Sequence, residues 1–203
     1  MDLDLDELSL RLLGCLIEKQ MTTPEYYPLT INALTAAANQ KTNRDPVTSF
    51  SEAEVLDGIN ALRERGLVRA VRSPGGRSAK YKHALDDMLE IDTEQASLLA
   101  VLMLRGEQTA GELRLRTERY CDFPSVEQVE AVLAGLQTRD EPLTIRLERR
   151  PGEKEARHRH LLGNSDAPRP APATESAPPE DALTKLEARL AALEERVTAL
   201  ESN

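Results

Sequence analysis

The 203-residue sequence contains no tryptophan, only two phenylalanines and four tyrosines. Any core must therefore be filled mainly by aliphatic side chains. Apolar residues make up 40% of the chain, which suffices for modest cores in the one or two small domains expected at this length.

Cysteine and long apolar runs are also scarce. Cys15 falls in a predicted helix and Cys121 in a predicted loop, so both are expected to be free thiols. The longest apolar run, residues 98–104, is far too short to cross a bilayer. The acidic residues 2–7 are unlike a signal peptide. These absences predict a cytoplasmic protein with no membrane partner.

The most informative stretch is 51–83, where a capped helix runs directly into a basic hairpin. Ser51 and Glu54 have the spacing of a capping box, and apolar residues follow at helical period as Val55, Ile59 and Leu62. Gly66 is expected to end the helix. Two alternating strands then flank a Ser-Pro-Gly-Gly turn at 73–76. This order is typical of the recognition helix and wing of a winged helix-turn-helix domain.

The same pattern returns 74 residues later. Ser125 and Gln128 repeat the cap, and the apolar stripe recurs at identical spacing as Val129, Leu133 and Leu136. A second hairpin follows at 143–162. Because cap, stripe and hairpin recur in one register, the sequence predicts an internal duplication.

Further helices complete both copies. Helices are expected at 6–20 and 29–39 in the first copy, and in the second from a cap at Thr93 and from a capping box formed by Thr109 and Glu112. The predicted fold is mainly α with small β-hairpin wings. It comprises two winged helix-turn-helix domains at 5–86 and 91–163, a Pro/Ala-rich linker at 164–180 and a heptad helix at 181–203.

Three segments of the first copy are distinctive: GCLIEKQMTTPEYYPLTINAL from Gly14, NQKTNRDPV from Asn39, and SEAEV with LRERGLV in 51–68. Together they resemble the YceH-like family (UPF0502), and the resemblance covers roughly residues 5–163. It implies a tandem winged-helix architecture. It implies little about activity, since the family is largely uncharacterised, and no catalytic or ligand-binding residue is carried over from it.

The formal net charge of −9 disfavours general affinity for nucleic acid, but the charge is unevenly distributed. Cations gather on the two hairpins and on the polar loop 39–47. The candidate DNA-binding residues are Lys41, Asn43, Arg44, Arg69, Arg72, Arg77, Lys80, Lys82, Arg149, Arg150, Arg157 and Arg159.

Each of these groups has a plainer interpretation. The hairpin cations either contact phosphates or belong to solvated strands whose charges neutralise acidic neighbours. Loop 39–47 either contacts DNA directly or is structural, with Asn39 capping the preceding helix and Asp45-Pro46 forming a turn. The helix before each hairpin is a poor candidate for contacting DNA bases in the major groove. Its acids, Glu52 and Asp57 in the first copy and those in 127–130 in the second, would repel the phosphates.

Nothing in the sequence indicates an enzyme. There is no nucleophile paired with a base, no phosphate-binding glycine loop and no pair of catalytic carboxylates. His158 and His160 share one face of a strand, but a surface pair is favoured over a metal site. No catalytic residue, metal or cofactor is predicted.

The tail has a heptad seam at spacings of three and four, formed by Leu183, Leu186, Leu190, Leu193, Val197 and Leu200. With Leu183 at position a, Arg189 faces Glu194 and Arg196 faces Glu201 in a parallel pair. The tail therefore predicts a parallel homodimer, although a helix this short is marginal alone.

Two functions follow from these features. The first is a DNA-binding protein, a transcriptional regulator that contacts the backbone of duplex DNA through basic wings. The alternative is a protein-interaction or scaffolding module of tandem winged helices that does not bind DNA.

Overall fold

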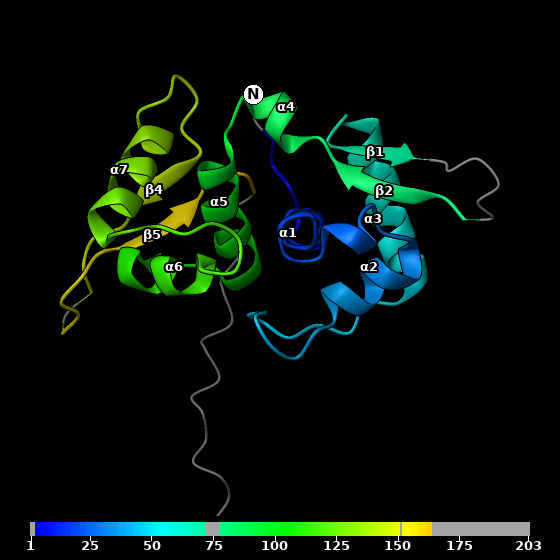
Figure 1. The fold of residues 1–203 in the computed structure, drawn as a ribbon, viewed down its shortest axis with the longest axis horizontal. Coiled ribbons are helices and arrows are strands. Elements are labelled where there is room, and N and C mark those ends of the chain that lie inside the picture. The colour runs from blue at the N-terminus through cyan, green and yellow to red at the C-terminus, as the bar shows by residue number, and fades with distance from the viewer. Residues whose placement is uncertain (1–2, 72–77, 151, 164–203) are drawn as a thin grey trace, which may run out of the picture. The chain divides into compact units, whose positions relative to one another are not determined.

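The computed structural model describes residues 3–71, 78–150 and 152–163, all within one compact unit, Met1–Ser165. The predicted linker and heptad helix, including Leu183 and the other seam residues, lie outside the described residues. The described chain is mainly helical with small antiparallel sheets, as predicted (Figure 1). Within it, no helix is both long and apolar enough to span a membrane.

The N-terminal half, residues 3–83, has the element order helix, helix, helix, hairpin. Its elements are α1 (Glu7–Thr22), the 3-10 turn η1 (Pro24–Tyr26), α2 (Ile31–Ala38), α3 (Glu52–Glu64), β1 (Val68–Val71) and β2 (Lys80–His83). β1 and β2 pair antiparallel. Gly66 follows α3 with a φ of +76°, the left-handed conformation predicted for it. This order is compatible with a winged helix.

The C-terminal half, residues 92–163, repeats the order with one addition. Its elements are α5 (Thr93–Arg105), β3 (Gln108–Thr109), α6 (Ala110–Thr117), α7 (Val126–Gln137), β4 (Thr144–Arg146) and β5 (Arg157–His160). β5 lies between β3 and β4 in an antiparallel sheet. The short helix α4 (Leu85–Leu89) connects the halves. The sequence pattern had predicted neither β3 nor α4.

The helix caps agree with local sequence in most cases. The capping boxes of Ser51 with Glu54 and of Thr109 with Glu112 are both complete. α5 is capped by Asp92 rather than by the predicted Thr93, and Asp92 forms its own box with Gln95.

The second predicted box at 125–128 is only half formed. The Ser125 hydroxyl accepts from the Gln128 backbone N–H, but the Gln128 side chain donates instead to Glu94 at 2.9 Å. This bond joins α7 to α5, so a contact between helices replaces the local one.

One hydrophobic core runs through both halves. In Figure 1, α1 is seen end-on between α5 on one side and α2 with α3 on the other, and it contacts all three. The core joins residues of α1 such as Leu12 and Leu16 to Leu104 of α5 and Leu143 before β4. A smaller cluster lies among α5, α6 and α7. The middle of α1, between Ser9 and Glu18, is consequently almost entirely buried.

The two ends of the described chain also meet. Leu5 forms a parallel bridge with Gly163, and the Leu5 N–H donates to the Leu162 carbonyl at 3.0 Å. A Cβ on Gly163 would collide with the Leu5 carbonyl oxygen, so the close approach requires glycine at this position.

Candidate nucleic-acid interface

Strand register places the described cations of the first hairpin on one face. Val68 pairs with His83 and Arg69 with Lys82, while Val71 pairs with Lys80. Paired residues in an antiparallel ladder lie on the same face. Val68 and His83 are buried, so Arg69, Lys80 and Lys82 share the opposite, outward face. The hairpin thus presents three predicted contacts together.

The hairpin is attached to the body by the segment after α1. The backbone groups of Leu29 and Tyr81 exchange hydrogen bonds at 3.1 and 2.7 Å, and the Tyr27 hydroxyl accepts from the His83 N–H at 2.9 Å. The edge of β2 that does not pair with β1 is therefore held by a backbone bridge and by a side chain, which fixes the hairpin against the body.

One cation of this face has an acidic partner. The Arg69 guanidinium lies 2.8 Å from the Asp87 carboxylate, and both side chains are more than half exposed, at 55% and 64%. A solvated pair of this kind contributes about 0–1 kcal/mol, so a phosphate can compete for Arg69. Arg72 and Arg77, the predicted contacts nearest the turn, lie outside the described residues.

α3 borders the hairpin but does not resemble a base-reading helix. Its first turns expose Glu52, Glu54 and Asp57. A shallow hollow of about 770 Å³ lies where α3 ends and β1 begins, lined in part by Asn60, Arg63 and Arg69. Carboxylates therefore occupy the first turns of α3, and cations flank its last turn.

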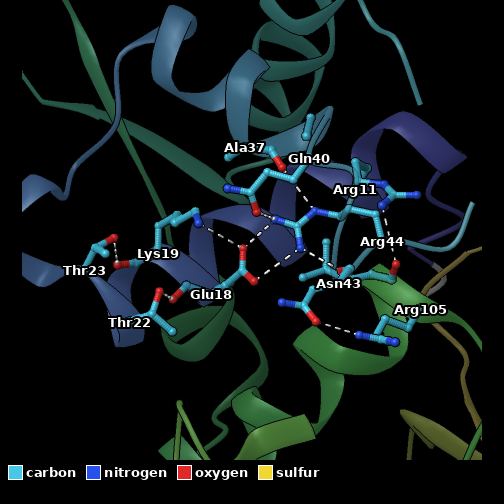
Figure 2. Close-up of polar contacts among 12 residues, drawn as sticks. Arg11, Glu18, Lys19, Thr22, Thr23, Ala37, Gln40, Asn43, Arg44 and Arg105 are labelled. Carbon is cyan, nitrogen blue, oxygen red and sulfur yellow. Dashed lines mark hydrogen bonds and ion pairs between the residues drawn. The ribbon is translucent and has the colours of Figure 1, made fainter. Parts of the chain in front are cut away.

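Arg44, for which the sequence left direct DNA contact and a structural role both open, lies inside the molecule. It is 6% exposed, and its guanidinium donates to both carboxylate oxygens of Glu18, at 3.2 and 2.5 Å (Figure 2). Further donor bonds reach the carbonyls of Ala37 and Asn43 and the amide oxygen of Gln40. This geometry supports the structural interpretation of the loop for Arg44.

The rest of the loop is anchored in the same way. Asn43, with a φ of +59°, accepts from Arg105 of α5 at 2.8 Å through its side-chain oxygen. Buried Arg11 of α1 donates to the Pro46 carbonyl at 2.6 Å. The Asn39 side chain bonds both backbone groups of Phe50. Of the three loop residues predicted to contact DNA, Lys41 and Asn43 are exposed.

The charges of Arg44 and Glu18 stabilise each other. Burial alone would raise the pKa of Glu18, but the hydrogen bonds and charge of Arg44 outweigh it and hold that pKa below its usual value. Burial likewise opposes ionisation of Arg44, yet Glu18 keeps the pKa of Arg44 raised. The Tyr120 hydroxyl donates to Glu18 at 3.0 Å. Glu18 and Tyr120 were not singled out from the sequence; an acid inside the apolar helix 6–20 was the available signal.

The second hairpin uses more of its arginines internally. Arg157 lies 3.0 Å from Glu112 and 3.3 Å from Glu153, with 26% of its side chain exposed. Arg150 pairs with Glu107 at 2.6 Å. Arg149 is exposed and Arg159 partly buried. Some of its cations are therefore engaged by acids of the chain, while Arg146 and Lys154 are exposed.

The histidines of the two hairpins do not form a metal-binding cluster among the described residues, and two of them are buried. His83 and His158 are buried, and burial lowers the pKa of each. Burial, with a smaller effect of Arg159, lowers the pKa of His160 to about 4. Its Nδ1 accepts from the Leu162 N–H at 3.3 Å, which requires an unprotonated nitrogen. Among the residues described, no three His, Cys, Asp or Glu side chains are grouped to hold a metal.

Fold and surface together define a mainly helical protein in which a helix, helix, helix, hairpin order occurs twice. The chain belongs to the family described as "Protein of unknown function, DUF480", whose model matches residues 5–153. It is similar to UPF0502 proteins of Geotalea uraniireducens (48% identical over 200 residues, 97% of this chain and 90% of the relative) and Geobacter metallireducens (46% over 200 residues, 97% and 90%). A UPF0502 protein of Aliivibrio fischeri is 48% identical over 161 residues, 77% of this chain and 74% of the relative. The family resemblance predicted from the sequence is confirmed.

Proposed function

We propose that this chain is a protein of two tandem winged helices that binds duplex DNA through the phosphate backbone, chiefly with the hairpin β1–β2. The observation that carries the proposal is the shared outward face of Arg69, Lys80 and Lys82. Cations on a wing beside the third helix are placed where this fold meets DNA. Arg72 and Arg77, outside the described residues, belong to the same proposed surface.

The proposed binding mode is electrostatic and independent of base sequence. Exposed carboxylates on the first turns of α3 disfavour its entry into the major groove. The buried guanidinium of Arg44 and the paired Arg150 and Arg157 contribute less than the sequence suggested. Lys41 and Arg149 remain exposed candidates. Parallel pairing of the tail through Leu183 and its heptad partners would give the assembly two such wings.

A fluorescence anisotropy titration with a labelled duplex tests this proposal. Changing Arg69, Lys80 and Lys82 together to Gln should weaken binding at low salt by at least roughly tenfold. The slope of log affinity against log salt should become shallower by about 2.7, since each lost phosphate contact contributes about 0.9.

The matched control removes three exposed cations that lie outside the proposed contacts, by changing Arg119, Arg146 and Lys154 to Gln. It produces the same net charge but should leave most of the affinity. Absence of binding even at low salt would rule the proposal out. Equal losses in both variants would show that overall charge, rather than the first hairpin, determines binding.

The alternative, a protein-docking module, is favoured by a different surface. α3 exposes Leu56, at 40%, between Glu52 and Asp57. An apolar side chain surrounded by acids suits a partner with a basic rim better than it suits DNA. In a pull-down, reversing Glu52 and Asp57 to Lys should then release the partner, whereas the hairpin variant should retain it.

A further inference from the structure

A small hollow lies apart from the hairpins, where the loop of the N-terminal half meets α5 and α6. Its volume is about 220 Å³. Three of its lining residues are the arginines Arg105, Arg116 and Arg119, and Asn43 lies on the loop side. Figure 2 shows Asn43 and Arg105 beside the buried pair of Arg44 and Glu18. The hollow therefore gathers guanidinium groups from two helical segments.

Two of these arginines, Arg116 and Arg119, have little acid of their own to pair with. Arg116 shares Glu112 with Arg157, at 3.6 and 3.0 Å respectively. Arg119 is exposed, and among the residues described it has no hydrogen bond or ion pair. Burial lowers the pKa of Arg116 most, and the charge of Arg105 lowers it further.

Several acids also lie around the hollow. Glu18 lines it but is already bound by Arg44, Lys19 and Tyr120. Glu118 lines it from an exposed position. Asp45 and Glu112 act on Arg116 electrostatically, and Arg157 opposes them.

The wall beside the arginines is apolar. Val101, Leu104 and Leu115 line the hollow. Leu115 is 65% exposed, whereas Leu113, two residues earlier in α6, is buried. A site of about 220 Å³ is smaller than the roughly 300–1,000 Å³ typical of pockets for drug-sized ligands. Arginine forks match the oxygens of carboxylates and phosphates.

We propose that this hollow binds a small organic anion. A carboxylate or phosphate group lies among Arg105, Arg116 and Arg119, and a short apolar part packs against Leu115. The site uses none of the hairpin cations, so its existence does not depend on DNA binding.

Calorimetric titration of the full chain tests the site with four probes: phenyl phosphate, benzoate, inorganic phosphate and benzyl alcohol. Either aromatic anion should bind saturably, and the neutral alcohol should bind at least roughly tenfold more weakly. The stronger of phenyl phosphate and benzoate identifies the preferred head group. Tighter binding of the aromatic anion than of inorganic phosphate would support the apolar contact.

Two variants and one control locate the binding. Arg116→Gln and Arg119→Gln should each raise the dissociation constant roughly tenfold, whereas Arg146→Gln, an exposed arginine of β4, should leave it unchanged. Arg119 is exposed, so its variant keeps the test valid if Arg116→Gln fails to fold. The inference is overturned if no anion saturates by about 10 mM, if the alcohol binds equally well, or if all three variants behave alike.

Discussion

Arg44 lies 26 positions from Glu18 in the chain, yet its guanidinium holds both oxygens of that carboxylate inside the protein. The polar loop around it has no apolar periodicity, so the sequence left exposed and structural roles equally open. Burial of an arginine is decided by distant partners, here an acid on α1 and carbonyls of α2 and the loop. Lys41, three residues earlier, stays exposed.

Arg44→Met should lower the free energy of unfolding by roughly 3–5 kcal/mol, because it leaves a buried carboxylate without its partner. Chemical denaturation at pH 7 measures the loss. Lys41→Met is the matched control, because the same change at an exposed position should stay within about 0.5 kcal/mol. Similar losses in both variants would contradict the importance of the buried pair.

The deficit of Arg44→Met should also shrink on acidification. In the native protein Arg44 keeps the pKa of Glu18 low, so its stabilising contribution is present above the ordinary range of a glutamate and is lost only as the pH falls through the lowered value. Without Arg44, burial raises that pKa, and protonation of Glu18 above the ordinary glutamate range then relieves the variant. A deficit that grows toward acid pH would exclude this account.

At the scale of elements, α1 shows what periodicity can and cannot establish. The apolar stripe predicted a helix at 6–20, and α1 spans Glu7–Thr22. The stripe predicted one buried face, whereas α1 is covered by α2 and α3 on one side and by α5 on the other. Gly14 lies at the contact with α5, where an added Cβ would approach the Leu104 side chain to 2.8 Å.

Gly14→Ala should therefore destabilise the protein by about 1–3 kcal/mol through overpacking, even though alanine favours helix. Gly135→Ala in α7 is the matched control, since nothing lies within 4 Å of its added Cβ. There the intrinsic helix preference acts alone and should stabilise by up to about 1 kcal/mol. Thermal unfolding of the two variants should shift in opposite directions; shifts of the same sign would contradict the close α1–α5 contact.

Local signals predicted the elements best. Two capping boxes, the end of α3 at Gly66 and the antiparallel hairpins depend on residues close in sequence, and the structure confirms them. The short β3 and α4 have too few residues for a periodic signal. Gln128 left its predicted cap for Glu94 on another helix. The hollow beside Arg116 and Arg119 depends on packing between the halves, which no local pattern encodes.

At the scale of the whole molecule, one hydrophobic core joins the two halves of the described chain. The predicted duplication places a domain boundary between these halves, at residues 86–91. Leu104 of α5 is buried in the same cluster as residues of α1, α2 and α3. Repeated motifs predict the order of elements and hence a boundary between two copies. They do not predict whether the two copies share one core, and stability depends on that shared core. That boundary stays a prediction.

We expect residues of both halves to unfold in one cooperative transition. Leu104→Ala should cost roughly 2–5 kcal/mol and should reduce hydrogen-exchange protection equally in α2 and α7. Leu115→Ala, at an exposed leucine of α6, is the control and should change protection little. Loss of protection confined to one half would show that the halves unfold independently.

The bridge between Leu5 and Gly163 gives the described chain the path of a nearly closed ring. A gene that joins these positions through a short peptide and opens the ring in another exposed loop would encode a circular permutant with the same core. Cargo attached before Leu5 or after Gly163 would therefore depart from the same spot on the protein.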